Sequence, residues 1–243
     1  MTPPFDTTAV TEKRLIPFPD VSVVMSRNPH QRGTATLFME SWPAPAPDSP
    51  QMPPLTYPAP HVIACSNASI LLDLHRSDID MVIWGRVVPD VWHKALAEPA
   101  SSRNVFDMCV TREELADALT SRTLAKEFPP LVLSDAAELS SLFSAVTKDC
   151  PQRLRLATMP PEDGTFKAAS GALRLVCCYG AANVEWCSYP DPKVGMTNTL
   201  DAFAVVFIKG SGGHESGCLH RVCHAKRGGV TSGIHLIIDI LTG

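Results

Sequence analysis

The chain has 243 residues, 45% of them hydrophobic and 19% charged, with a formal net charge of −4 and a pI of about 6.0. This length and apolar content supply a core for one large domain or two small ones. No basic stripe interrupts the sequence, so we do not expect a nucleic-acid partner. The longest apolar run, Ala202–Ile208, is far shorter than the roughly 20 residues that span a bilayer. The N-terminal residues show no secretory pattern. We therefore expect a cytoplasmic protein, with no membrane contact and with its eight cysteines as free thiols.

The first part of the chain is rich in proline. Residues 43–60 contain eight prolines, which lack the backbone donor that helices and sheets require. We predict that residues 1–60 form a proline-rich arm and that 61–243 form a single α+β domain.

Helical signals dominate the prediction for the next part of the chain. Met81–Trp84 is predicted to be a buried strand, and Pro89 to begin a helix that runs to about Glu98. Thr111 and Glu114 have the spacing of a capping box, with a helix to about Leu119. A further helix is predicted from Ser134 to Pro151. Its apolar face comprises Leu139, Leu142, Phe143 and Val146.

Strand-like runs replace the helical signals after about residue 154. Turn-rich segments separate them, which is typical of a β-sandwich or barrel. The predicted strands are Leu154–Met159, Ala172–Tyr179, Ala202–Lys209 and Ile234–Leu241. The predicted fold class is therefore α+β, with a mainly helical N-terminal half followed by an antiparallel β-sandwich.

Several short motifs in the second half resemble a bacterial family designated domain of unknown function 1826. The family pattern reads approximately Phe-His-x-Asp, then Arg-Leu, then a tyrosine-to-Glu-Trp block, then His-Arg, and ends with an apolar strand near an aspartate. The matching residues are Phe166, Arg174, Leu175, Tyr179, Glu185, Trp186, His220, Arg221 and Leu236–Asp239, with Ile83, Trp84 and Arg86 upstream. The His-x-Asp…His pattern of this family implies a jelly-roll, double-stranded β-helix fold that holds iron(II) with two histidines and a carboxylate.

The resemblance fails at two of the three implied metal ligands. Lys167 stands at the histidine position and Ala169 at the aspartate position, so only His220 remains. The arginine that would bind a carboxylate co-substrate is not recovered, although His235 lies close to its expected place. We therefore expect no bound metal and no cofactor, and we expect Lys167 and His220 to face one cavity.

Lys167, Glu185 and His220 are the candidate catalytic residues. A buried Lys167 would serve as a base or form a Schiff base, whereas a solvated one would merely replace a lost ligand. Glu185 is either a pocket carboxylate or a turn cap. A separate cluster near the C-terminus offers weak zinc candidates because its spacing matches no standard site. These candidates are Cys218, His220, Cys223 and His224.

Three functions follow from these expectations. We favour an accessory subunit without catalysis of its own, which binds a second protein subunit and stabilises or completes a partner enzyme. The alternative is a metal-free enzyme of specialised metabolism that uses the same cavity for a small-molecule ligand. The third is an iron-dependent oxygenase.

Overall fold

The computed structural model describes residues 61–96, 104–111, 114, 118–119, 121, 123–158, 164–188, 197–210, 217–224, 226–227, 230–231 and 233–241. The predicted proline-rich arm lies outside these residues, so it stays a prediction. Among the described residues, no helix is both long and apolar enough to cross a membrane.

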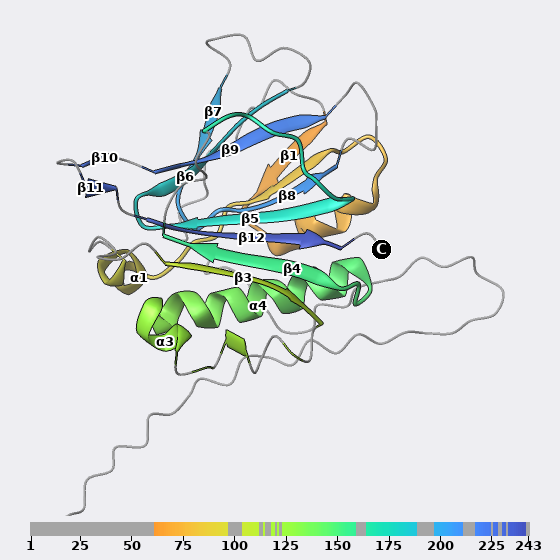
Figure 1. Cartoon of the computed structure of the whole chain (residues 1–243). Coiled ribbons are helices and arrows are strands. Elements are labelled where there is room, and N and C mark those ends of the chain that lie inside the picture. Colours follow the sequence, from red (N-terminus) through yellow and green to blue (C-terminus); the bar gives the residue numbers. More distant parts are fainter. Residues whose placement is uncertain are drawn as a thin grey trace, which may run out of the picture. The chain divides into compact units, whose positions relative to one another are not determined.

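A seven-stranded sheet forms the centre of the described region (Figure 1). Its strands, in spatial order, are β1 (Val62–Cys65), β2 (Met81–Trp84), β8 (Val205–Lys209), β5 (Leu173–Tyr179), β12 (Ile234–Ile240), β4 (Gln152–Ala157) and β3 (Val105–Val110). All neighbours pair antiparallel except β1 and β2, which run parallel. The predicted strands correspond to β2, β4, β5, β8 and β12. Strand β8 begins three residues later than predicted, because residues 201–204 form a turn in which Phe203 has a φ of 70°.

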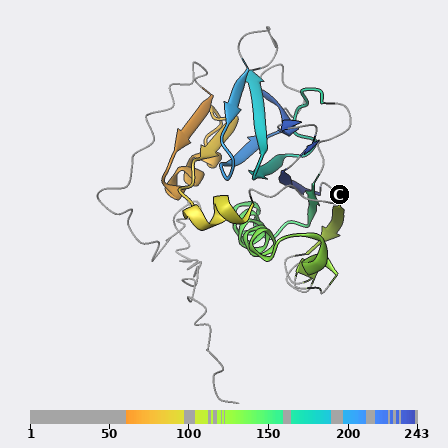
Figure 2. The same cartoon turned by 90° about the vertical axis from the view of Figure 1, so that its left-hand side faces the viewer.

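A smaller sheet covers part of one face of the large sheet (Figure 2). It contains β7 (Asn198–Leu200), β6 (Ala182–Ser188) and β9 (Cys218–His224). Lys167 extends this sheet by an antiparallel bridge to His220 on β9. Eight segments are numbered 1 to 8 in chain order: β4, the Lys167 bridge, β5, β6, β7, β8, β9 and β12. The hairpin of β10 (Lys226–Arg227) and β11 (Val230–Thr231) is left out of this numbering. The large sheet then contains the order 1-8-3-6, and the small sheet has the order 2-7-4-5. This is the double Greek key of a jelly roll.

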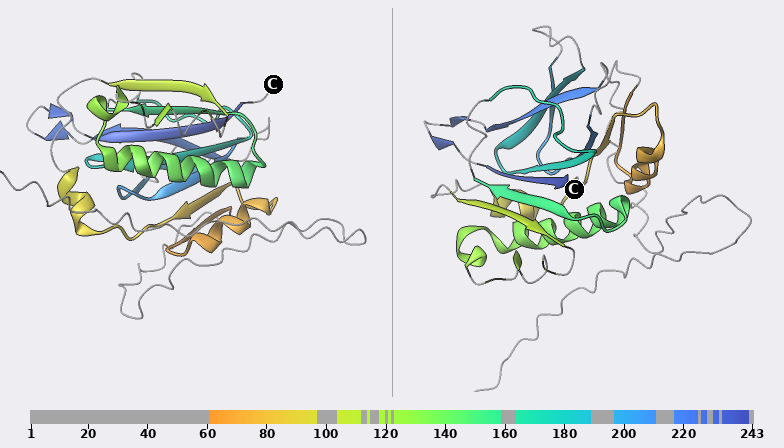
Figure 3. Two further views of the ribbon diagram at one scale, coloured as in Figure 1. Left: turned by 90° about the horizontal axis from the view of Figure 1, so that it is seen from below. Right: turned by 45° about the vertical axis from the view of Figure 1, so that its right-hand side comes forward.

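Helix α4 (Pro130–Thr147) packs on the other face of the large sheet (Figures 1 and 3). It begins four residues before the predicted start, since Pro130 occupies the first turn, where its missing N–H costs no hydrogen bond. It ends at Thr147, and the next residue, Lys148, caps the helix in a left-handed conformation. Phe143 stacks on Phe207 of β8 with 6.2 Å between ring centroids. The helix, the large sheet and the small sheet therefore form three layers with two hydrophobic interfaces.

The interface between the two sheets follows from strand alternation. Alternate residues of β5, β8, β6 and β9 point into the space between the sheets. These side chains include Val176, Cys178, Val206, Ile208, Val184, Trp186, Cys218 and Val222. Trp186 is fully buried there and lies opposite His220 in the strand register.

The mainly helical N-terminal half is not shown. Its described residues supply three strands of the large sheet, β1, β2 and β3, alongside the short helices η1 (Ala68–His75), α1 (Asp90–Ala95) and α3 (Leu124–Glu127) and the longer α4. The capping box is present, because the carboxylate of Glu114 accepts the backbone N–H of Thr111 at 3.0 Å. Most of the helix predicted after it lies outside the described residues.

Cysteine accessibility gives a test of this layering. Cys65, Cys109 and Cys150 are exposed, whereas Cys177 and Cys178 are buried on opposite faces of β5. We expect the first three to react with a thiol reagent in the native state and the last two to react only after unfolding, because burial raises the pKa of both thiols and blocks access. Mass spectrometry of the labelled peptides measures this, and early labelling of Cys177 or Cys178 would contradict the layering.

Candidate ligand site between the sheets

Lys167 and His220 lie directly opposite each other at the end of the small sheet. Each backbone N–H donates to the other residue's carbonyl at 2.9 Å. Directly paired residues of an antiparallel ladder have side chains on the same face. Both also line one cavity, as expected from the sequence. The two differ in burial, however, because His220 is 4% exposed while Lys167 is exposed to solvent. The burial that a catalytic lysine at this position would need is therefore absent.

Arg174 on β5 is held beside His220 by a network of polar contacts. Its Nε and Nη2 donate to the two carboxylate oxygens of Asp239 at 2.7 and 2.9 Å, and Nη2 also donates to Ser170 at 2.7 Å. Its Nη1 lies 3.2 Å from Nε2 of His220. Arg174 and Asp239 are register partners on β5 and β12, and both are largely buried. The guanidinium thus has a fixed position at the imidazole.

The protonation state of His220 follows from this environment. Burial, together with the positive charge of Arg174, lowers the pKa of His220 to about 3, although a backbone hydrogen bond with Lys167 opposes the shift. The ring is therefore neutral at pH 7. Since a guanidinium can only donate, Nε2 accepts from Arg174 and the ring proton is on Nδ1. This Nδ1 is buried and has no hydrogen-bond partner among the protein atoms.

A cavity of about 50 Å³ lies at this point between the sheets. Its lining residues are Gly164, Thr165, Lys167, Arg174, His220, Arg221, Val222 and Ile237. Lys167 and Arg174 bring cationic side chains to it, whereas the side chain of Arg221 pairs with Glu185, which lies opposite it in the strand register. The two carboxylates that pair with the arginines, Asp239 and Glu185, are not among the lining residues.

Glu185 is not placed with the other two candidate catalytic residues. It lies on β6 opposite Arg221, with which it forms an ion pair at 2.6 Å. Its neighbour Trp186 points into the space between the sheets, so Glu185 points to the outer face. Of the two alternatives for Glu185, the pocket carboxylate is not supported, because Glu185 does not line the cavity with Lys167 and His220. The physical reason is the strand alternation, which sends adjacent residues to opposite faces.

The C-terminal cysteine and histidine cluster does not converge. Cys218, His220 and His224 occupy alternate positions on β9 and share the inner face, while Cys223 points outward. Side chains at such spacing are separated by about 6.6 Å per step, which is too far for a shared tetrahedral ion. Within the described residues, no group of three or more His, Cys, Asp or Glu side chains could hold a metal.

His224 instead contacts His235 on the facing sheet. Nε2 of His224 lies 3.4 Å from Nδ1 of His235, and the rings meet edge to face. Burial lowers the pKa of His224 to about 4. Burial, together with the charges of His224 and Arg155, lowers that of His235 to about 3. His235 thus belongs to a pair of neutral imidazoles inside the sandwich.

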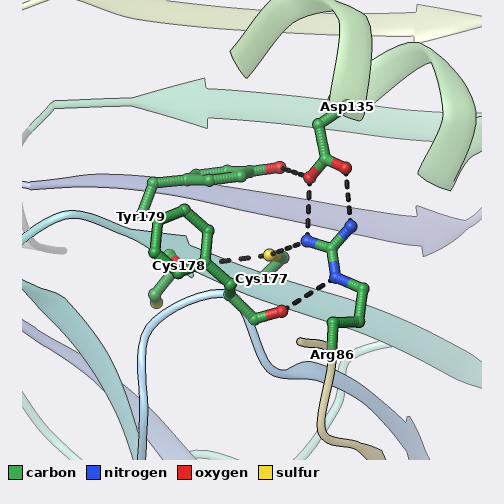
Figure 4. Close-up of polar contacts among 6 residues, drawn as sticks. Arg86, Asp135, Cys177, Cys178 and Tyr179 are labelled. Atoms are coloured by element: carbon green, nitrogen blue, oxygen red, sulfur yellow. Dashed lines mark hydrogen bonds and ion pairs between the residues drawn. The ribbon is translucent and has the colours of Figure 1, made fainter. Parts of the chain in front are cut away.

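A second polar network, between the large sheet and α4, contains two of the motif residues (Figure 4). Arg86 donates to both carboxylate oxygens of Asp135 at 2.6 and 2.9 Å, and to the carbonyl of Phe203 at 2.9 Å. The hydroxyl of Tyr179 donates to Asp135 at 2.7 Å, and Arg86 also contacts the Cys177 sulfur at 3.3 Å. All polar groups of Arg86 and Asp135 are satisfied and buried. Arg86 and Tyr179 therefore fix α4 to the sheet and do not line the cavity.

Sequence reasoning assigned no role to Arg174, Asp239, Arg86 or Asp135. The sequence nevertheless contains a signal for such buried ion pairs, which is a charged residue within an otherwise apolar segment. Arg174 in LRLVCCY and Asp239 in IHLIIDI have opposite charges on buried strands. A buried charge requires a partner of the opposite sign. The sequence nevertheless does not say which charge pairs with which.

The fold and the site together define a jelly-roll protein with an arginine beside the histidine of its cavity. The model of the family described as "Protein of unknown function (DUF1826)" matches residues 66–231, and the chain belongs to this family. No curated protein matches the sequence.

Among solved structures, the chain is similar to a rice dioxygenase for auxin oxidation, with 16% identity over 63% of this chain and 64% of that chain and a TM-score of 0.38. It is also similar to a bsmA homolog from Methylobium petroleophilum PM1, with 11% identity over 72% and 93% and a TM-score of 0.40. A third is the full-length Neurospora crassa T7H in complex with alpha-KG, with 10% identity over 74% and 83% and a TM-score of 0.37. The chain spans about two thirds of the length of the rice enzyme. Such low identities and scores carry no argument about activity.

The residues at the cavity do not fit the iron ion that the motif pattern implies. Ala169 has no ligand atom and packs in the apolar interface between the sheets. Lys167 offers an ammonium, and the Nε2 lone pair of His220 already accepts a hydrogen bond from Arg174. A metal cation at this nitrogen would have to displace a guanidinium that is fixed by Asp239.

Proposed function

We propose that this chain is an accessory subunit without catalysis of its own, built on a jelly roll in which an arginine has replaced the catalytic metal. The observation that carries this proposal is the 3.2 Å contact between Arg174 and Nε2 of His220. Neutral His220 with a pKa of about 3 is a weak base, and Glu185 is on the other face of the sheet. No pair of these groups therefore has the acid and base arrangement that catalysis near pH 7 requires.

The partner surface that we propose is the edge strand β3. It is the last strand of the large sheet, and its Val105 and Met108 are 53% and 38% exposed. Edge strands with apolar side chains are suited to pairing with another chain. A second subunit that covers β3 would bury these side chains and leave the cavity accessible.

Metal binding tests the first part of the proposal. The wild-type chain, incubated with iron(II) without oxygen and then desalted, is expected to retain no stoichiometric iron by elemental analysis. The variant Lys167→His/Ala169→Asp/Arg174→Ala restores three ligands and removes the guanidinium, so it is expected to retain iron if it folds. Arg174→Ala alone removes the repulsion between the guanidinium and the metal without adding ligands. It therefore separates this repulsion from the absence of ligands as a cause of the missing iron. One iron per wild-type chain would overturn the proposal.

Partner binding tests the second part. The chain is co-expressed with the products of the genes next to its own, and complexes are measured by size-exclusion chromatography with light scattering. We expect a defined complex that Val105→Lys/Met108→Lys weakens at least tenfold. Leu72→Lys on η1, where the side chain is 44% exposed, is the matched control. His220→Ala is expected to change the partner's activity less than threefold. Substrate turnover by the isolated chain that Lys167→Ala abolishes would favour the metal-free enzyme instead.

A further inference from the structure

The cavity beside His220 has a lining that is rich in donors and poor in acceptors. Lys167 and Arg174 bring two cationic side chains to it, from two different segments of the chain, while the side chain of Arg221 pairs with Glu185 on the outer face. No carboxylate side chain is among its lining residues. His220 is also a lining residue, and its buried Nδ1–H has no hydrogen-bond partner among the protein atoms. Such a group costs about 1–3 kcal/mol unless something accepts its hydrogen bond.

Arg174 is preorganised for anion binding, because its guanidinium already has a fixed position. Asp239 holds its Nε and Nη2 by two short hydrogen bonds, and Ser170 adds a third. Only Nη1 is directed to His220, so the edge of the guanidinium that carries Nη1 faces the cavity. A donor fixed in this way loses little conformational entropy on binding. Lys167 lines the same cavity and is exposed to solvent, so it brings a positive charge to the opening.

The size of the cavity limits what can enter. A volume of about 50 Å³ exceeds the roughly 30 Å³ that one water occupies in the liquid, but it is far smaller than the several hundred Å³ of a drug-sized site. The space therefore suits one compact group of a few heavy atoms. The exposed residues Gly164 and Thr165 form part of the lining, so a larger molecule could insert only its head group.

We infer that this cavity binds a compact oxyanion, either a free inorganic anion or the anionic head group of a larger molecule, between Lys167, Arg174 and His220. The inference rests on the proposed function, in which the cavity holds no metal. The cationic and N–H groups that would bind an anion would repel a metal cation. Arg174 and His220 contact the anion through N–H groups, and Lys167 balances its charge. A small molecule with an anionic group could therefore bind to the accessory subunit at this cavity.

The test uses the full chain, treated with EDTA, at pH 7.5 and constant ionic strength. Sodium phosphate and sodium acetate are titrated separately against sodium chloride, with isothermal calorimetry and the thermal midpoint as readouts. We expect saturable binding of phosphate, acetate or both, and a shift of the imidazole nitrogen resonance of His220. Lys167→Gln is expected to weaken Kd at least fivefold. Lys126→Gln, an equal change of charge on exposed α3, is expected to leave Kd within twofold of wild type.

The outcomes separate the inference from the proposed function. Binding of phosphate alone assigns a tetrahedral anion, and binding of acetate alone assigns a carboxylate. Absence of saturable binding, or equal losses in Lys167→Gln and Lys126→Gln, overturns the anion site but leaves the accessory role standing. Anion binding that appears only after iron is added overturns both, because it places a metal in the cavity.

Discussion

Replacement of Asp135 by alanine is expected to destabilise the fold by about 3–5 kcal/mol, which is the cost of leaving a buried charge without its partner. Asp135 is 1% exposed and accepts hydrogen bonds from Arg86 and Tyr179. Burial by itself lowers the pKa of Arg86, and neighbouring Cys177 and Asp135 more than offset it, so the net pKa is raised. Because a guanidinium stays protonated in proteins, Arg86 keeps its charge when Asp135 is removed.

Urea unfolding followed by tryptophan fluorescence measures this loss. If Asp135→Ala does not fold, Tyr179→Phe gives a graded version, because it removes one hydrogen bond to Asp135 and is expected to cost about 1–2 kcal/mol. The double variant Arg86→Met/Asp135→Leu removes both charges and is expected to be more stable than Asp135→Ala.

A matched control is available on the same large sheet. Arg153 and Asp107 form the same type of two-pronged ion pair, at 2.8 Å, but their side chains are 53% and 29% exposed. Asp107→Ala is expected to cost at most about 1 kcal/mol, because water screens the pair. Equal losses at Asp135 and Asp107 would contradict the view that the buried network fixes α4 to the sheet.

Mild acid is expected to destabilise the protein strongly, because two buried histidines and one half-buried histidine resist protonation in the folded state. The pKa is lowered to about 3 for His220 and His235 and to about 4 for His224, mainly by burial. In the unfolded chain a histidine titrates near pH 6.5. Below that pH the unfolded state binds more protons, so stability falls as the pH decreases toward the folded pKa.

The expected slope is about 1.4 kcal/mol per pH unit for each fully buried histidine. His220 and His235 together give an upper limit of about 4 kcal/mol between pH 6.5 and 5, and the less buried His224 adds a smaller amount. The carboxylates whose pKa is lowered titrate near pH 4 in the unfolded chain, so they change stability mainly below this window.

Urea unfolding at half-unit steps from pH 7.5 to 5 measures the slope. His235→Gln is expected to reduce it by about half, since it removes one of the two fully buried rings. His75→Gln, at an exposed position on η1, is expected to leave it unchanged. A stability that does not change between pH 7.5 and 5 would show that water reaches these imidazoles.

The sequence by itself determined the elements whose signals are local. Apolar runs identified β2, β4, β5, β8 and β12, and the spacing of Leu139 and Phe143 identified α4. The motif blocks identified the family, and the spacing of Thr111 and Glu114 identified the capping box. These features depend on residues within a few positions of each other, so periodicity and turn chemistry are sufficient to find them.

Only the tertiary structure decided which residues share a site. Glu185 was grouped with His220, yet the register of β6 against β9 sends it to the outer face, beside Arg221. Arg174 and Asp239 are 65 residues apart and meet because β5 and β12 are neighbours in the sheet. Such contacts depend on strand order and register, and a slip of one residue would send every side chain of a strand to the other face. The sequence therefore identified His220 as a motif residue, and only the fold showed that Arg174 contacts it.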